Sequence, residues 1–407
     1  MTIPITRPWF DQDELAAVGK ALNSGWVAQG FKVTEFECLI AQHEDVKYGI
    51  ATSSCTTALH LAMVAQGMHE GMDVLIPAFT FVATANAVVE TGATPILVDI
   101  DTDTFNISIA EVRSVIINNY KEIDGELVNI KTGNALWGIV PVHQFGLCCN
   151  IEEINKIAKE YNLTVIEDAA CALGASYRGI HPGGFGNTAC VSFHPRKSIT
   201  TGEGGMILSD DKKLTERLRG LRSHGCTISA DERDKNRGFL LPEYDEFGFN
   251  YRMTDIQGAI GIAQVGKLDM ILKKRRKLAN RYNELIKCYL PNLIIPIEPL
   301  DYFHTYQSYV CMLRVNDNDD FDVIDEVGKL RNRVMSALED CGVSTRQGTH
   351  AIHVLECYRN KYQYSEHDFP NAFKSDRLSI SLPLYVGMTE EEQKYVIDSL
   401  KGAINNA

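Results

Sequence analysis

The sequence has no long apolar run and no excess of basic residues, and each absence argues against a class of protein. No stretch reaches the roughly 20 apolar residues of a membrane-spanning helix, and the first ten residues lack the pattern of a signal peptide. We therefore expect a cytoplasmic protein that does not contact a membrane. Lys and Arg number 40 against 53 Asp and Glu, a net charge of −13. This balance argues against a nucleic-acid-binding protein, which needs a basic face.

The cysteines also form no recognisable pattern. There are eleven, an odd number, with no CxxC motif and no neighbouring His at the spacing of metal ligands. A chain of 407 residues is too large to need disulfides for its stability. We therefore expect no metal site, and reduced, mostly buried thiols.

Helical and strand patterns alternate from about residue 12 to residue 222. The strands are apolar throughout, which is typical of a mostly parallel sheet with helices on both faces. The sequence thus predicts an α/β fold with a smaller α+β C-terminal domain. Its main strands are expected at Tyr48–Thr52, Val74–Pro77, Thr94–Asp99, Trp137–Val142, Leu163–Glu167, Cys190–Phe193 and Met206–Leu208.

The length of the chain indicates two domains. We expect a large domain over 12–255 and a small one over 256–407, with residues 1–11 packed on the small one. A long helical pattern over Asp255–Tyr289 would bridge the two. Two polar segments, 118–134 and 226–246, are expected to be surface excursions, and nothing in them identifies a substrate.

Lys197 is the first candidate for chemistry. It follows an apolar strand and precedes a glycine-containing turn, where a ligand could approach the backbone closely. Desolvation there would lower the lysine pKa and free the amine for Schiff-base formation. Taken alone, a lysine in such a position is more commonly a surface residue.

Asp168 is the second candidate. It ends the apolar strand that begins at Leu163, at the sheet edge where open α/β proteins bind ligands. A carboxylate there suits the protonated ring nitrogen of pyridoxal phosphate. The alternative is that Asp168 caps a helix starting at Ala169.

Two further segments complete the set. Hydroxyl residues at 53–57 precede an apolar helix, and a helix N-terminus with hydroxyl groups is a phosphate site; helix capping by Ser54 or Thr56 is the alternative. Phe79 and Phe81 follow a strand, either as core residues or as a face on which a flat ring could stack.

Together these segments resemble the DegT/DnrJ/EryC1/StrS family of pyridoxal-phosphate-dependent sugar aminotransferases, which have the type I fold. The resemblance runs nearly from end to end, and its most specific mark is SFHPRKSITTGEGG at 192–205. It is supported by EDAACALGA at 167–175, LRSHG at 221–225 and GFNYRMTDIQ at 248–257.

The resemblance implies the roles of individual residues. Lys197 would form the internal aldimine and move the proton, and Asp168 would hold the pyridinium nitrogen. Phe81 matches an aromatic residue that stacks on the cofactor, and Asn250 matches one that reaches the phosphate of the neighbouring subunit, which implies a homodimer with shared active sites. The remaining implied cofactor contacts are Ser54, Cys55, Thr56, Cys171 and Ser192.

Two residues depart from the family pattern. Many members have Gln or His where this chain has Cys171, and a thiol is a poor hydrogen-bond donor. The family's Gly-Pro is Gly30-Phe31 here, so the local turn is expected to differ. By contrast, Lys197 is present where a dehydratase branch has histidine, which favours transamination.

The resemblance implies transfer of an amino group from an amino acid, expected to be L-glutamate, to a keto group of a nucleotide-linked sugar. Cationic residues would bind the nucleotide diphosphate, and the candidates are Arg222, His224, Arg252 and Arg346. Each could instead be a solvated surface charge. Two alternatives remain: amination of a cyclitol or another keto substrate, and a non-catalytic regulatory or binding protein with the same fold.

Overall fold

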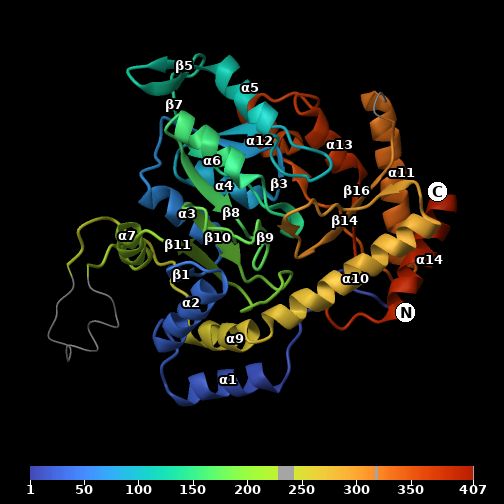
Figure 1. Ribbon diagram of the computed structural model, residues 1–407, viewed down its shortest axis with the longest axis horizontal. Helices are drawn as coiled ribbons and strands as arrows, with labels where there is room; N and C mark the ends of the chain where they lie inside the picture. The colour runs from blue at the N-terminus through green and yellow to red at the C-terminus, as the bar shows by residue number, and fades with distance from the viewer. Residues whose placement is uncertain (228–242, 317–319, 407) are drawn as a thin grey trace.

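The computed structural model describes residues 1–227, 243–316 and 320–406, so most of the segment expected to form a loop at 226–246 lies outside the described residues. A central sheet organises the larger part of the molecule (Figure 1). Its order is β1-β11-β10-β8-β7-β2-β4, and β11 alone runs antiparallel to the other six. The predicted mostly parallel α/β sheet is therefore confirmed.

The strand bounds lie close to those predicted. The seven strands are β1 (Tyr48–Thr52), β2 (Met72–Pro77), β4 (Thr94–Val98), β7 (Ala135–Ile139), β8 (Thr164–Asp168), β10 (Thr188–Ser192) and β11 (Gly205–Ser209). The helices around them are α1 (Gln12–Asn23), α2 (Phe31–His43), α3 (Cys55–Ala65), α4 (Val82–Glu90), α5 (Ile109–Asn119), α6 (Ile151–Glu160), α7 (Lys212–Arg222) and α9 (Asp255–Val265).

The segment 118–134 forms a hairpin of β5 (Tyr120–Ile123) and β6 (Glu126–Asn129), and β6 pairs with β7. Its polar residues hold the buried carboxylate of Asp73. The hydroxyl of Tyr120 and the amide of Asn129 donate to Oδ2, and the amide of Asn134 donates to Oδ1. The hairpin therefore extends and fastens the sheet.

The predicted single helix over Asp255–Tyr289 is wrong. Helix α9 ends at Val265, and α10 (Leu268–Tyr289) begins after Gly266 and Lys267. Helix α9 packs against α1 and α2, whereas α10 runs toward the C-terminal part of the chain, which contains a second sheet (Figure 1). The expected domain boundary at 255/256 stays a prediction.

The second, three-stranded sheet has the order β12-β14-β16, formed by β12 (Leu293–Ile294), β14 (Tyr309–Leu313) and β16 (Ser379–Leu382). The helices in this part of the chain are α10, α11 (Phe321–Asp340), α12 (Glu356–Tyr362), α13 (Pro370–Leu378) and α14 (Glu390–Asn406). The N-terminal segment joins this part, because Ile3 forms a bridge with Val343 and the carbonyl of Ile5 accepts from the amide of Leu384.

Two short pairs connect the parts of the chain. Strand β13 (Tyr302–Phe303) pairs with β9 (Ser176–Tyr177), and β15 (His350–Ala351) pairs with β3 (Phe79–Thr80). The second pair brings the chain after α11 to the segment that leads into α4. The C-terminal part of the chain is thereby tied to the edge where the predicted site lies.

The departure at Gly30-Phe31 leaves the start of α2 intact. The carboxylate of Asp255 accepts hydrogen bonds from the backbone amides of Gly30, Lys32 and Val33. Phe31 occupies the first helical position, where proline is favoured because its missing N–H is not needed. Phenylalanine can therefore replace the family's proline there while Asp255 caps the helix.

The cysteines agree with the prediction only in part. No disulfide joins the eleven cysteines, but only five of them are buried, fewer than expected, and Cys38, Cys288, Cys341 and Cys357 are exposed. Across the described ranges, no helix has both the length and the apolar character needed to cross a membrane.

Candidate active site

The carboxyl ends of the parallel strands bring the predicted segments to one edge of the sheet. Cys190 in β10 pairs with Asp168 in β8, and Ser192 at the end of β10 pairs with Gly205 at the start of β11. Gly205 also pairs with Thr52 at the end of β1. The loops that carry the lysine, the aspartate and the hydroxyl turn therefore leave the same edge.

Lys197 meets Cys171 at this edge. Its Nζ lies 3.1 Å from the Cys171 Sγ. Burial by itself lowers the Lys197 pKa, but the contacts with Cys171, and more weakly with Cys55 and Asp168, outweigh it and leave the pKa above its ordinary value. The predicted lowering of this pKa is therefore wrong for the chain alone, because these neighbours, which come from distant parts of the chain, favour the protonated amine.

Asp168 is a buried carboxylate with two protein partners. The Thr84 hydroxyl donates to Oδ2 at 2.7 Å, and the Ala170 amide donates to Oδ1 at 3.1 Å. Burial raises the Asp168 pKa, and these two hydrogen bonds only partly offset that effect. Residues 169–175 form turns, so the alternative that Asp168 caps a helix starting at Ala169 is wrong.

The hydroxyl turn is the N-terminus of α3. Ser54 caps the helix by accepting from the Thr57 amide, so the alternative of capping holds for Ser54. The first-turn amides of Cys55 and Thr56 have no acceptor within the helix, which suits an anion. A Cβ atom at Gly205 would lie 2.5 Å from the Cys55 nitrogen. Glycine at 205 is therefore what lets β11 pass so closely behind this turn.

Ser192 and Phe81 have contrasting environments. Ser192 is buried, and its Oγ accepts from the His194 amide at 3.3 Å. Phe81 precedes α4 and is 63% exposed. An exposed aromatic ring beside the buried Thr84–Asp168 pair is available for stacking on a ligand, whereas Phe79 is fully buried core.

Asn250 lies on a segment that pairs with the chain after α7. Ser223 forms a bridge with Asn250, and the carbonyl of Tyr251 accepts from the amide of Ser53. Asn250 itself is exposed. The backbone of this segment is thus adjacent to the hydroxyl turn of its own chain, while the Asn250 side chain faces solvent.

The environment of Arg222 differs from that expected of a residue that binds a nucleotide. It is buried, and its Nη1 donates to Glu37 Oε1 at 2.6 Å and to the carbonyl of Ala51 at 2.7 Å. The carboxylate of Glu37 also accepts from the Ala51 amide. This buried ion pair joins α2, β1 and α7, so the structure favours a role in stability for Arg222.

Replacing Arg222 by methionine should therefore lower the free energy of unfolding by about 3–5 kcal/mol, because Glu37 loses its buried cation. Urea denaturation measures this effect. The matched control is Arg219→Met, since Arg219 is 43% exposed and its nitrogen is 3.4 Å from Glu37. The control should cost about 1 kcal/mol or less. Unchanged stability with a raised KM for the sugar substrate would return Arg222 to the substrate site.

The other three predicted cations are not gathered in one place. Arg252 donates to the Ser223 hydroxyl at 3.2 Å, and His224 is the next residue along from that serine. His224 is exposed, and its φ is +66°. Arg346 is exposed on a different part of the chain, where its backbone pairs with Ser381. Arg252 and His224 thus share the neighbourhood of Asn250, whereas Arg346 does not.

Sequence reasoning missed two residues that support Asp168. Thr84 comes from α4 and holds the second carboxylate oxygen. His143 is buried beneath β8, where its Nε2 lies 2.8 Å from Glu167 and its backbone amide donates to the Asp168 carbonyl. Nothing in their local sequence distinguishes them, because both act through contacts that only the folded sheet creates.

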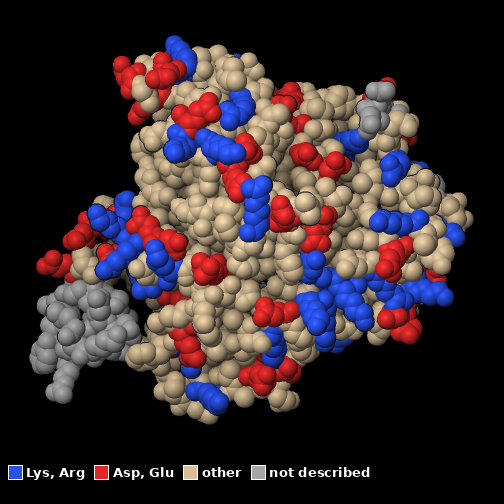
Figure 2. Space-filling model, in the orientation of Figure 1, with Lys and Arg blue, Asp and Glu red and all other residues tan. Residues whose placement is uncertain are grey.

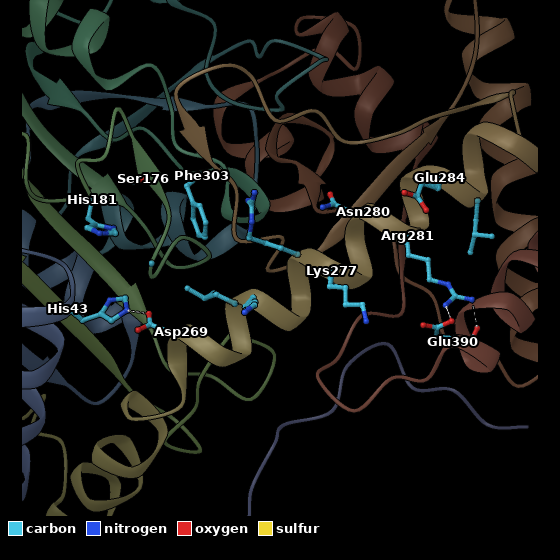
Figure 3. Close-up of a pocket in the computed structure, with 15 residues that line it drawn as sticks. His43, Ser176, His181, Asp269, Lys277, Asn280, Arg281, Glu284, Phe303 and Glu390 are labelled. Atoms are coloured by element: carbon cyan, nitrogen blue, oxygen red, sulfur yellow. Dashed lines mark hydrogen bonds and ion pairs between the residues drawn. The ribbon is translucent and has the colours of Figure 1, made fainter.

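A wide groove lies elsewhere, between α10 and the segment around β9 (Figure 3). Its volume is about 1230 Å³, and none of the predicted site residues lines it. Lys273, Lys277 and Arg281 contribute positive charge, and Figure 2 shows Lys and Arg gathered over α10. We assign the site to the sheet edge because the reactive groups converge there. No group of His, Cys, Asp and Glu in the described residues is arranged to hold a metal ion.

Comparison with known proteins gives a consistent result. Residues 8–401 match the DegT/DnrJ/EryC1/StrS aminotransferase family. The chain is 33% identical to GDP-perosamine synthase of Escherichia coli O157:H7, covering 98% of this chain and 97% of that protein. It is 32% identical to spore coat polysaccharide biosynthesis protein SpsC of Bacillus subtilis, covering 100% and 98%.

A solved structure has the same fold. The putative sugar aminotransferase Spr1654 from Streptococcus pneumoniae, in its PMP-form, superposes with a TM-score of 0.86 at 22% identity over the whole of both chains. This confirms the predicted type I fold. With the match over nearly all of its length, the chain belongs to the DegT/DnrJ/EryC1/StrS aminotransferase family.

Proposed function

We propose that this protein is a pyridoxal-phosphate-dependent aminotransferase that moves the amino group of L-glutamate to a keto group of a nucleotide-linked sugar. The observation that carries the proposal is the convergence of the Lys197 amine and the buried Asp168 carboxylate at one sheet edge, in front of the α3 N-terminus. The names of the relatives, a GDP-perosamine synthase and a spore coat polysaccharide protein, support a sugar substrate.

The residues at this edge fit the cofactor. Asp168 is a buried carboxylate with no cation among its hydrogen-bond partners, and a protonated ring nitrogen would supply one. Ser192 and the first turn of α3 would hold the phosphate, and Phe81 would cover the ring. When bound, pyridoxal phosphate supplies an electron sink. The chain's own part is to hold it through Lys197 and to move a proton to and from the substrate carbon with the same amine.

The sugar nucleotide needs cations for its diphosphate. We assign this role first to Arg252 and His224, which lie beside Asn250, and leave Arg346 as a candidate from the other part of the chain. We do not assign Arg222 to the diphosphate, because its guanidinium group already forms a buried ion pair with Glu37.

Two measurements test the function. Purified protein should show a visible absorption band that borohydride removes, with the modification found at Lys197. The protein should then aminate a nucleotide-linked ketosugar in a panel of 3-keto and 4-keto compounds, with L-glutamate as donor. Amination of a cyclitol alone would favour the first alternative. Absence of the band together with tight ligand binding would favour a non-catalytic binding protein.

We also propose a homodimer whose active sites each use Asn250 of the neighbouring chain. Large apolar side chains are exposed next to the start of α2, with Phe31 62% and Trp26 44% exposed, and a second copy would cover such residues. Closed twofold dimers are also the commonest homo-oligomers.

Co-expression of a Lys197→Ala chain with an Asn250→Ala chain is expected to restore activity, although each variant alone is defective. In a shared-site heterodimer, one active site carries both lesions and the other carries neither. The measurement is specific activity of the isolated heterodimer, selected with two different affinity tags. If Asn250 acts within its own chain, each site carries one lesion and no activity returns.

A further inference from the structure

Cys171 and Lys197 are in direct contact in the site. Cys171 lies three residues after the end of β8, and Lys197 lies five residues after the end of β10. Their Sγ and Nζ atoms are 3.1 Å apart.

Cys171 also differs in accessibility from the buried cysteines of the central sheet and of α3. Cys55 and Cys190 are buried, whereas Cys171 is partly exposed. A small oxidant can therefore approach Cys171 from solvent. The exposed cysteines, such as Cys38, have no lysine amine in contact. Accessibility and an adjacent amine thus coincide at Cys171.

We propose that Cys171 is an oxidative modification site, at which hydrogen peroxide converts the Cys171–Lys197 contact into a covalent sulfur–nitrogen bond. The sulfur first attacks one peroxide oxygen, giving a sulfenic acid and one water. Nζ then releases its ammonium proton to solvent and attacks the sulfur, and a second water leaves, in the manner of known condensations of sulfenic acids with nitrogen. In balance, one thiol, one amine and one peroxide give the bond and two waters. The sulfur loses two electrons, which reduce the peroxide.

The bond would consume the amine on which the proposed function depends, and the effect on activity rests on that proposed function. The bond formation itself rests only on the contact. Two equivalents of a thiol reverse it, because they regenerate the Cys171 thiol and the Lys197 amine and leave as a disulfide. The modification is therefore a reversible inactivation. It would act while Lys197 is free, and not while Lys197 holds the cofactor.

Peptide mass spectrometry tests the proposal. The purified full chain is divided into one portion left as purified and one incubated with L-glutamate, and both are treated with peroxide and digested with trypsin. The bond should join peptide 160–178 to peptide 197–212, with a mass two hydrogen atoms below their sum, and thiol treatment should separate them. If the proposed function holds, the L-glutamate portion should contain several times more of the linked pair. Equal amounts in both portions would support the bond and count against the proposed function.

Matched variants complete the test. Cys171→Gln should give no linked peptide, whereas Cys38→Ser, which removes a cysteine outside the site, should give as much as the unchanged protein. Linked peptides in the Cys38→Ser protein but not in Cys171→Gln support the proposal. Peroxide treatment that yields only sulfinic acid at Cys171, or a disulfide from it, with no linked pair in either portion, overturns it.

Discussion

Replacement of Lys197 by alanine is expected to reduce transamination by about 10⁴-fold or more. Proton transfer by a positioned side chain is typically worth about 10²- to 10⁴-fold, and this variant loses covalent attachment of the cofactor in addition. The contact of Lys197 with Cys171 is a local one, so the fold should remain. The measurement is single-turnover amination of the sugar, with circular dichroism as the check on folding.

Lys197→Arg is the matched control for charge. It keeps a cation near Cys171 and Asp168 but cannot form an imine, so its activity should be as low as that of the alanine variant. If the arginine variant retains more than about a tenth of the activity, Lys197 acts through its charge alone. Wild-type turnover in both variants would remove Lys197 from the chemistry.

The location of Lys197 and Asp168 could be predicted because it depends on strand order and direction. Apolar strands alternating with helices require a parallel sheet, and loops that follow parallel strands leave from the same edge. The residues after β8 and β10 therefore had to approach one another. The exact neighbours could not be predicted, since the Cys171–Lys197 contact depends on how two loops turn after leaving the sheet.

The role of Arg222 shows a second limit of prediction from the sequence. Its sequence neighbours, Ser223 and His224, suggested a binding loop. Its partner Glu37 is 185 positions away in the chain and belongs to a helix with no apparent relation to the site. A buried ion pair of this kind leaves no local signal, because each member alone looks like an ordinary helix-surface charge.

The break between α9 and α10 was missed for a local reason. Gly266 and Lys267 interrupt a pattern that otherwise has helical periodicity on both sides, and one glycine in such a pattern is often tolerated. Helix α9 packs on α1 and α2, while Arg275 of α10 donates to the carbonyls of Tyr306 and Gln307. The two helices end up apart because each follows a different set of tertiary contacts.

Replacement of Asp168 by asparagine is expected to lower activity without lowering stability. Asp168→Asn should lower the rate of transamination by about 100- to 1,000-fold, because an amide cannot balance a protonated ring nitrogen. Burial raises the pKa of Asp168 above 3.8 in the folded chain. The folded state therefore binds this proton more tightly than the unfolded one, and stability falls as the pH rises through the interval between the two pKa values. Asparagine is neutral at every pH, so the cofactor-free variant should unfold at pH 7 at the same urea concentration as the unchanged chain, or a higher one.

Asp73 provides the control, because it is also a buried aspartate at the sheet. Three side-chain donors, from Tyr120, Asn129 and Asn134, satisfy its carboxylate, whereas Asp168 accepts only two hydrogen bonds. An asparagine at 73 would turn an N–H group toward one of these donors, so Asp73→Asn should lose about 1–3 kcal/mol of stability with little change in rate. The two substitutions are chemically identical, and only the surroundings differ. If Asp168→Asn instead loses stability as Asp73→Asn does and keeps its rate within about tenfold of the unchanged protein, the carboxylate at 168 serves the fold and not the cofactor.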